Sequence, residues 1–218
     1  MRSFPVDALS ENLHTPEAVI KSFPQEIVLV TQGPFPPPPL AESTNQLPSS
    51  PMFTVEDGPC KDLGKGGYIY EVKSDIFPAA TSMSGGLIHL ETGSLRTIHW
   101  HPNADEMHYV INGTLKVSVY GIGGQSETYD IEAGDIGFVP KGFAHYLEAV
   151  NGPADILVTF NDPKWQNQEL STWMAVTPLH LTATSLQTTE ESIAGFPKSA
   201  ELFYGVEVKE CPRRVRRY

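Results

Sequence analysis

The chain has 218 residues, a formal net charge of −11 and 40% hydrophobic residues. This length suffices for one barrel or sandwich domain with extensions, and the hydrophobic fraction is large enough for a core. The charge argues against nucleic acid and membranes as partners, and no stretch approaches the roughly 20 apolar residues of a membrane span. Because the N-terminus lacks a signal-peptide core, we expect a soluble, cytoplasmic protein; a signal removed before residue 1 would instead allow secretion.

Residues 1–52 are expected to form a proline-rich N-terminal arm and not a domain. Thr15-Pro16-Glu17 predicts a short helix over residues 16–22, with a proline at its first position and an acidic first turn. Gln25–Thr31 has the composition of a short strand. The prolines that follow are typical of an extended surface segment or linker, which we favour over a peptide-recognition role.

Between residues 53 and 176 the chain consists of short apolar runs separated by turns. Many short strands with little helix between them indicate an all-β sandwich or barrel. Asn112-Gly113 predicts a hairpin between two of them, since both turn residues accept a positive φ. The predicted strands are Gly67–Val72, Gly86–Glu91, Leu95–Trp100, Met107–Ile111, Thr114–Tyr120, Glu127–Ile131, Ile136–Val139, His145–Val150, Ile156–Phe160 and Ser171–Val176.

Residues 177–218 are expected to form a short helical appendage and a basic tail. Thr189-Glu190-Glu191-Ser192 before an apolar pair suggests the helix, and the chain ends in a run with four arginines. A solvated tail or a contact with the acidic body is favoured over an interaction motif. The two cysteines, Cys60 and Cys211, are too few for a disulfide scaffold, and whether they pair stays open.

A group of histidines and one glutamate carries the candidate chemistry. His99 and His101 lie at i and i+2 of a predicted strand, so both imidazoles project from one face. Glu106 opens the next strand as a possible carboxylate ligand, and His145 is the best candidate for a fourth ligand. Three imidazoles and a carboxylate bind a divalent transition metal and leave one or two positions exchangeable. His108 lies two residues after Glu106, and packing is its preferred interpretation.

The spacing of these residues resembles the two motifs of the cupin family. That resemblance implies a jelly-roll barrel that holds one metal ion through His99, His101, Glu106 and His145. The asparagine that usually ends the second motif is replaced by Ala149, which is not a ligand position. The first motif runs from Gly93 through His99-x-His101 and Glu106 to Gly113, and the second from Gly134 through Pro140-x-Gly142 to His145.

A closer resemblance, to the oxalate decarboxylase branch, rests on LRTIHWHPNADEMHYVINGTLKVSVYG and IEAGDIGFVPKGFAHYLEAV. It implies that manganese and dioxygen activate oxalate, which is cleaved to formate and carbon dioxide. Arg96 stands where that family carries a substrate-binding arginine. In a regular strand it would face away from His99, so sharing the cavity requires a bulge or strong twist. The usual Ser-Glu-Asn-Ser lid is absent from residues 165–171, where Glu169 is the acid placed to replace it; an exposed loop glutamate is the alternative.

Several alternatives remain open under this resemblance. The decarboxylases carry two barrels per chain and this sequence has one copy of the motifs, so a homodimer or larger homo-oligomer is expected, as in the germins. Oxalate oxidase or another cupin dioxygenase is the second enzymatic interpretation. The third is a non-enzymatic germin- or spherulin-like storage or stress protein. Manganese is the expected ion, with iron, nickel, copper and zinc as alternatives.

Overall fold

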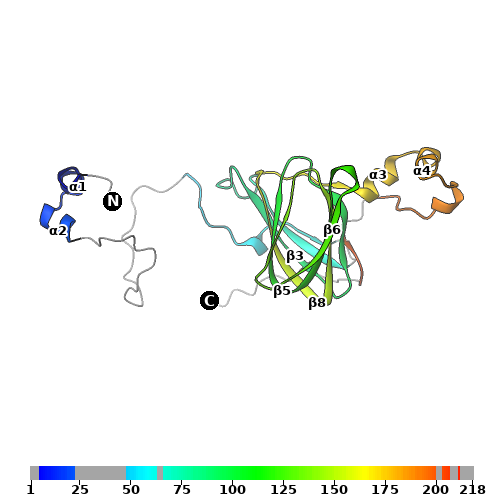
Figure 1. Ribbon diagram of the computed structural model, residues 1–218, viewed down its shortest axis with the longest axis horizontal. Coiled ribbons are helices and arrows are strands. Elements are labelled where there is room, and N and C mark those ends of the chain that lie inside the picture. Colours follow the sequence, from blue (N-terminus) through cyan, green and yellow to red (C-terminus); the bar gives the residue numbers. More distant parts are fainter. Residues whose placement is uncertain (1–4, 23–47, 63–65, 200–202, 207–210, 212–218) are drawn as a thin grey trace. The chain divides into compact units, whose positions relative to one another are not determined.

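The computed structural model describes residues 5–22, 48–62, 66–199, 203–206 and 211 (Figure 1). The chain divides into two compact units, Met1–Gln46 and Leu47–Tyr218. The predicted strand Gln25–Thr31, most of the proline-rich run and the arginine tail lie outside the described residues. None of the helices in the described part of the chain has the length and apolar character that crossing a membrane would require.

The first unit contains two short helices, α1 (Val6–Asn12) and α2 (Glu17–Lys21). The sequence predicts α2, although Pro16 is its N-cap and not its first helical residue. Lys21 Nζ lies 2.7 Å from Glu17 Oε2, an i,i+4 pair that stabilises the single turn. The sequence does not predict α1, which buries no side chain and therefore lacks the apolar stripe that marks a helix.

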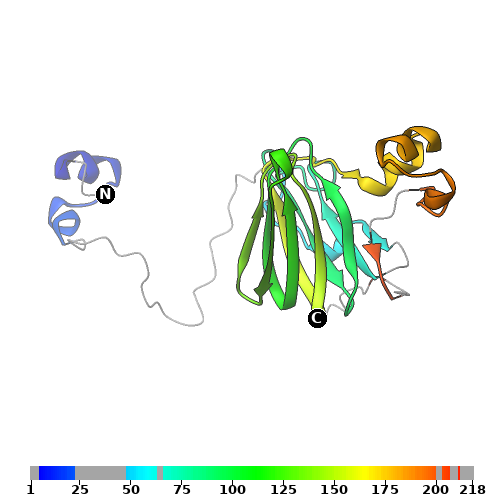
Figure 2. The ribbon, with the colours of Figure 1, turned by 45° about the vertical axis from the view of Figure 1, so that its right-hand side comes forward.

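The second unit is built on one antiparallel sheet of ten strands, which curls into a barrel (Figures 1 and 2). Hydrogen-bonded neighbours follow the order β1-β2-β3-β8-β4-β10; β5 pairs with β6, β7 and β8, and β9 pairs with β4. The strands are β1 (Cys60–Asp62), β2 (Gly67–Val72), β3 (Ser84–Leu90), β4 (Leu95–Trp100), β5 (Glu106–Tyr120), β6 (Ser126–Glu132), β7 (Ile136–Val139), β8 (Ala144–Phe160), β9 (Gln168–Glu169) and β10 (Phe203–Tyr204).

The barrel interior is filled by side chains from alternate positions of the strands. Along β3, every second residue is buried, as the pleat of a half-buried strand requires. The buried apolar cluster comprises Ile69, Ile88, Leu90, Ala104, Val110, Leu115, Val117, Ile131, Leu147, Ala149, Ala154, Ile156, Val158, Phe160, Trp165 and Phe203. This core surrounds the polar site described below.

The predicted hairpin at Asn112-Gly113 is wrong, because the two strands around it form the single long strand β5. Gly113 does adopt a positive φ of 84°, as a turn dipeptide predicts. The register against β8 shifts on both sides of Asn112. From Val110 to Asn112, two steps along β5 match one along β8, which is a bulge in β5; from Asn112 to Thr114, two steps match five, so the extra residues there are in β8. The bulge changes which face is buried: Val110 points inward before it and Leu115 after it. A positive φ therefore marked a bend in the strand and not a reversal of the chain.

The predicted strand Ser171–Val176 is also wrong, since these residues form helix α3 (Leu170–Val176). Short apolar runs do not distinguish a strand from a buried helix segment. Trp173 of α3 packs edge to face against Trp100, with ring centroids 6.5 Å apart. Helix α4 (Leu179–Ser185) follows, and α3 and α4 lie outside the barrel wall (Figure 2). Three 3₁₀ turns complete the described elements: η1 (Val55–Asp57), η2 (Ile122–Gly124) and η3 (Glu191–Ile193).

Cys60 and Cys211 form a disulfide, which answers the question that the sequence left open. The bond joins β1 to the C-terminal segment across 151 residues of sequence. Almost the whole barrel lies within this loop. Closing so long a loop restricts the unfolded chain more than the folded one, so the bond stabilises the second unit.

Candidate metal centre

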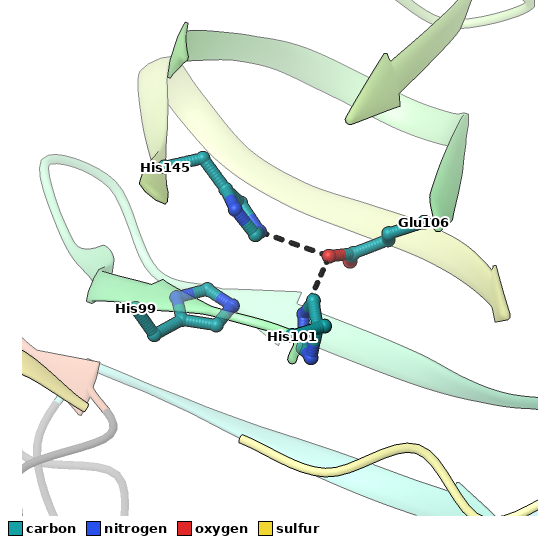
Figure 3. Close-up of side chains that lie close together, drawn as sticks. All are labelled: His99, His101, Glu106 and His145. Carbon is teal, nitrogen blue, oxygen red and sulfur yellow. Dashed lines mark hydrogen bonds and ion pairs between the residues drawn. The ribbon is translucent and has the colours of Figure 1, made fainter. Parts of the chain in front are cut away.

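Four side chains of the kind that bind metals converge inside the barrel (Figure 3). His99 lies on β4, His101 follows it directly, Glu106 opens β5, and His145 lies near the start of β8. One ligand atom from each residue lies within 4.8 Å of the others, and no side chain of the four is more than 3% exposed. The sequence-predicted ligand set is thus brought together from three strands.

The hydrogen bonds of the three histidines determine which ring nitrogen faces the site. Nδ1 of His99 lies 2.7 Å from the Thr97 carbonyl oxygen, and Nδ1 of His101 lies 2.9 Å from that of Gln166. Nδ1 of His145 lies 3.1 Å from the carbonyl oxygen of Phe143, two residues earlier in the chain. A carbonyl oxygen only accepts hydrogen bonds, so each Nδ1 carries a proton, and the Nε2 lone pair is the one left for ligation. This is the tautomer that ligates a metal.

These lone pairs point at a carboxylate. Nε2 of His101 lies 2.8 Å from Oε2 of Glu106, and Nε2 of His145 lies 2.9 Å from the same oxygen (Figure 3). The contact of His145 has hydrogen-bond geometry, so these atoms lie close enough to share one cation, either a proton or a metal ion. A metal ion among them would be bound by all of them. The donor set therefore fits a divalent transition metal ion.

The electrostatics of the site favour the protonation states that ligation needs. Burial lowers the pKa of His99 well below its usual value, and the charge of Arg96 lowers it further. Burial also lowers the pKa of His145, against the opposing effect of Glu106. Burial by itself would raise the pKa of Glu106, but the imidazoles of His108 and His145 outweigh it and hold that pKa well below its usual value. At neutral pH, His99 and His145 are neutral and Glu106 is ionised, as metal binding requires.

A clamp of hydrogen bonds positions the loop between His101 and Glu106. The side chain of Asn161 donates to Oδ2 of Asp105 at 2.6 Å and accepts from the backbone N–H of Asp105 at 2.8 Å. The backbone N–H of Lys141 donates to the other Asp105 oxygen, and the N–H of Gly142 donates to the carbonyl of His101. The turns that carry the ligands are therefore tied to each other and to the end of β8.

Arg96 reaches the same cavity because β4 is irregular. Arg96 pairs with Leu147 of β8 and His99 pairs with His145, so three steps along β4 match two along β8. One extra residue reverses the alternation of faces, which is the bulge that placing both residues in the cavity requires. Arg96 is 4% exposed and lines the cavity with the histidines.

Glu169 is buried against Arg96 and does not lie on an exposed loop. Strand β9 pairs with β4 so that Glu169 is opposite His99. Nη1 and Nη2 of Arg96 each donate to a different oxygen of Glu169 at 2.8 Å. This two-point geometry is the strongest form of an arginine–carboxylate contact. Of the two expectations for Glu169, the exposed loop glutamate is wrong. Because Glu169 lies behind Arg96, its role as a catalytic acid stays a prediction.

The cavity has a wall that the sequence analysis did not identify. Glu71, on the inward face of β2, pairs with Lys61 at 2.8 Å and with Lys73 at 3.4 Å. Lys73 Nζ in turn lies 4.0 Å from the ring centroid of Trp165, a cation–π contact. In the sequence, the available signal for Glu71 was its position two residues after Ile69, which places both side chains on the same face of the strand. The lining residues are Ile69, Glu71, Ile88, Arg96, His99, His101, Glu106, Val158, Phe160, Trp165 and Asn167.

A comparison with protein families adds to this geometry. The family model described as Cupin matches residues 56–194, which is more than half of the chain. The chain belongs to the cupin family. The curled antiparallel sheet and the clustered histidines of this cupin agree with that assignment.

Among known proteins, this cupin is similar to oxalate decarboxylases and to germin-like proteins. It is 30% identical to oxalate decarboxylase OxdC of Bacillus subtilis (strain 168) over 150 residues, 62% of this chain and 39% of that protein. It is 36% identical to germin-like protein 5-1 of Oryza sativa subsp. japonica over 89 residues, 39% of this chain and 40% of that one. The chain thus spans well under half the length of either relative.

The fold agrees with a solved structure of B. subtilis oxalate decarboxylase from work on its Mn(II) centres. The TM-score is 0.80 at 23% sequence identity, and the alignment covers 94% of this chain and 55% of that one. At this identity the agreement shows the fold alone. The reaction of this cupin has to be argued from its own site.

Proposed function

We propose that this cupin is a metal-dependent enzyme that acts on a small carboxylate, and that it cleaves oxalate, with uptake of one proton, to formate and carbon dioxide. The observation that carries the proposal is the buried guanidinium of Arg96 in the same cavity as the metal-ligand cluster. A guanidinium pairs with one carboxylate of a small dianion, which leaves the other for the metal. In a chain of net charge −11, such a local cation is what an anionic substrate needs.

Manganese is the ion that we propose for the site. His99, His101, Glu106 and His145 would hold it, and the Mn(II) centres of the B. subtilis oxalate decarboxylase support this choice. Iron, nickel, copper and zinc also accept imidazole and carboxylate ligands. When bound, the metal would supply Lewis acidity and, together with dioxygen, the redox chemistry that activates the substrate.

Glu169 is the proposed proton donor to the one-carbon fragment. In the structure both of its carboxylate oxygens are bound by Arg96. A substrate carboxylate that takes the two N–H donors now bound to Glu169 would displace it. Glu169 would then be free to turn towards the one-carbon fragment. Arg96 would bind the substrate and, by exchanging partners, prepare the acid.

The same pair favours oxalate oxidase as the second candidate. If Glu169 stays bound to Arg96 during turnover, no acid stands ready when the carbon–carbon bond breaks. Oxalate, dioxygen and two protons would then give two molecules of carbon dioxide and one of hydrogen peroxide. The segment 165–171, which lacks the decarboxylase lid sequence, supports this alternative.

Product analysis distinguishes these functions. Manganese-loaded protein would be incubated with ¹³C-oxalate and dioxygen at mildly acidic pH, with products identified by NMR and peroxide assayed in the same tube. Formate supports the decarboxylase, whereas peroxide with carbon dioxide and no formate supports the oxidase. Neither product, from protein shown to contain metal, would reject oxalate turnover and favour a germin- or spherulin-like storage or stress protein.

Self-association is part of the proposal, because the sequence has one copy of the cupin motifs and the decarboxylases pair two barrels. Sedimentation velocity at micromolar concentration tests it. A mass of at least twice 23.9 kDa would support a homodimer or larger assembly, and a mass of 23.9 kDa would contradict it.

A further inference from the structure

A fourth histidine lies inside the barrel beside the ligand cluster. His108 is two residues after Glu106 on β5 and faces the same side of the strand, as alternation requires. It is fully buried, and its Nε2 lies 3.0 Å from Oε1 of Glu106. This is the carboxylate oxygen that His101 and His145 do not contact, since both approach Oε2.

The ring of His108 differs from the three ligand histidines in its second nitrogen. Each ligand histidine has an Nδ1 directed at a backbone carbonyl, whereas neither ring nitrogen of His108 has a hydrogen bond of full geometry among the described residues, and the acceptor that Nε2 approaches is Oε1 of Glu106 at 3.0 Å. No acceptor therefore holds the proton of His108 on Nδ1. A proton on the nitrogen that faces the carboxylate avoids two facing lone pairs, which would cost more than an unpaired nitrogen on the other side of the ring.

We propose that His108 is a positioning residue: its Nε2 lies 3.0 Å from Oε1 of Glu106, and a small rotation of the ring aligns its N–H with that oxygen and so restricts Glu106 to one ligand oxygen, Oε2. The inference rests on the metal-binding part of the proposed function and does not depend on oxalate as the substrate. A carboxylate with both oxygens free could rotate and bind a metal through both of them. With Oε1 held by His108, only Oε2 faces the three histidines, and the remaining coordination positions stay open for small molecules.

The barrel leaves room for the ring of His108 at this place. In the pairing of β5 with β7, His108 is opposite Gly137. A Cβ atom at position 137 would lie 3.2 Å from Nδ1 of His108 and 3.2 Å from the side chain of Ile131. Any larger residue would therefore press on the imidazole and move it relative to Glu106. The absence of a side chain at Gly137 leaves the space that the ring occupies.

The tautomer of His108 can be measured in the wild-type protein. Protein labelled with ¹⁵N-histidine would be studied metal-free and zinc-loaded at pH 7.5 by long-range ¹H–¹⁵N correlation, with His108→Gln used to assign the signals. The expected result is a proton on Nε2 of His108 and on Nδ1 of His99, His101 and His145. A proton on Nδ1 alone at His108 would overturn the proposal. Because the metal-free spectrum decides this, a failure to bind metal, which would reject the proposed function, remains distinguishable.

Substitutions test the consequence for the metal. His108→Leu removes the donor, His108→Gln keeps an N–H donor, and Val110→Ala perturbs the same face of β5 without touching a polar group. We expect His108→Leu to lower the affinity for Mn²⁺ by about 10- to 100-fold and to change the zero-field splitting of the bound Mn(II) in its EPR spectrum. His108→Gln should restore both towards wild type. Wild-type affinity and spectrum in His108→Leu, no rescue by His108→Gln, or an equal loss in Val110→Ala would each contradict the proposal.

Discussion

Arg96 and Glu169 form a buried pair in which two guanidinium nitrogens each contact a different carboxylate oxygen at 2.8 Å. They are 73 residues apart in sequence, and each is only 4% exposed. A carboxylate that took these two N–H donors would displace Glu169. Under the proposed function the pair would therefore link substrate binding at Arg96 to the position of Glu169, and this link can be tested from both sides.

Replacing Glu169 should change the product of the reaction. In Glu169→Gln the side chain keeps its size but cannot transfer a proton. We expect formate production from oxalate to fall by about 100-fold or more, the scale of general acid catalysis, with manganese content unchanged. The measurement is product NMR on protein with a determined metal content. Glu190→Gln, an exposed glutamate of the C-terminal region, is the matched control and should behave as wild type. Undiminished formate in Glu169→Gln would remove Glu169 from the chemistry.

Breaking the pair from the other side should destabilise the fold. Arg96→Met leaves the Glu169 carboxylate buried without its partner, which we expect to cost about 3–5 kcal/mol in the free energy of unfolding. Replacing both residues, as in Arg96→Met with Glu169→Leu, removes the uncompensated charge and should recover most of that loss. Urea denaturation of the metal-free wild type, the two single variants and the double variant measures this double-mutant cycle. A double variant no more stable than Arg96→Met alone would show that the two side chains are not coupled.

The stability of the metal-free protein should fall as the pH decreases below 6.5. Burial lowers the pKa of His99 and His145 below their ordinary value of 6.5, so below that pH the unfolded chain binds protons that the folded chain does not. The free energy of unfolding then decreases by about 1.4 kcal/mol per pH unit for each histidine concerned. The pKa of Glu106 is also lowered in the folded protein, so it adds a loss in the same direction below its ordinary value of 4.5.

Urea denaturation between pH 8 and pH 5 measures this dependence. His145→Gln replaces one titrating ring by a neutral side chain and should reduce the slope. Stability that is constant or that rises towards pH 5 would contradict the assigned direction of these pKa shifts.

Manganese should stabilise the protein through the four ligands. At a free concentration of 100 times its dissociation constant, an ion that binds only the folded state adds about 2.7 kcal/mol. The melting temperature should therefore rise with added Mn²⁺ in wild type and not in His101→Ala. His180→Ala is the control, since His180 is exposed on α4 and distant in sequence from the ligands. An equal rise in His101→Ala would place the ion elsewhere.

Removing the Cys60–Cys211 disulfide should destabilise the barrel and leave the metal centre intact. The double substitution Cys60→Ser with Cys211→Ser opens a loop of 151 residues, for which we expect a loss of about 2–4 kcal/mol. Urea denaturation of the oxidised wild type and the double variant measures the loss, and Mn²⁺ titration of both should give the same affinity. Equal stability would show that the bond does not restrain the unfolded chain.

The cupin fold and the ligand set were accessible from the sequence because both depend on local spacing. His99 and His101 share a face through the two-residue period of a strand, and His145 follows a turn whose glycine and proline mark it in the sequence. The strands β2, β4 and β7 could be predicted with their observed bounds for the same reason. His108 was on the right face by alternation, but nothing local distinguishes a packing histidine from one that contacts Glu106.

The tertiary structure decided the features that depend on which strands pair with each other. Asn112-Gly113 is a frequent turn dipeptide, and only the pairing with the partner strand β8 places it at a register shift within a strand instead. The extra residue in β4 that brings Arg96 into the cavity is visible only in its register against β8. The burial of Glu169 follows from the pairing of β9 with β4. Such long-range pairings are chosen by the packing of the whole barrel, so the residues concerned carry no local signal of the outcome.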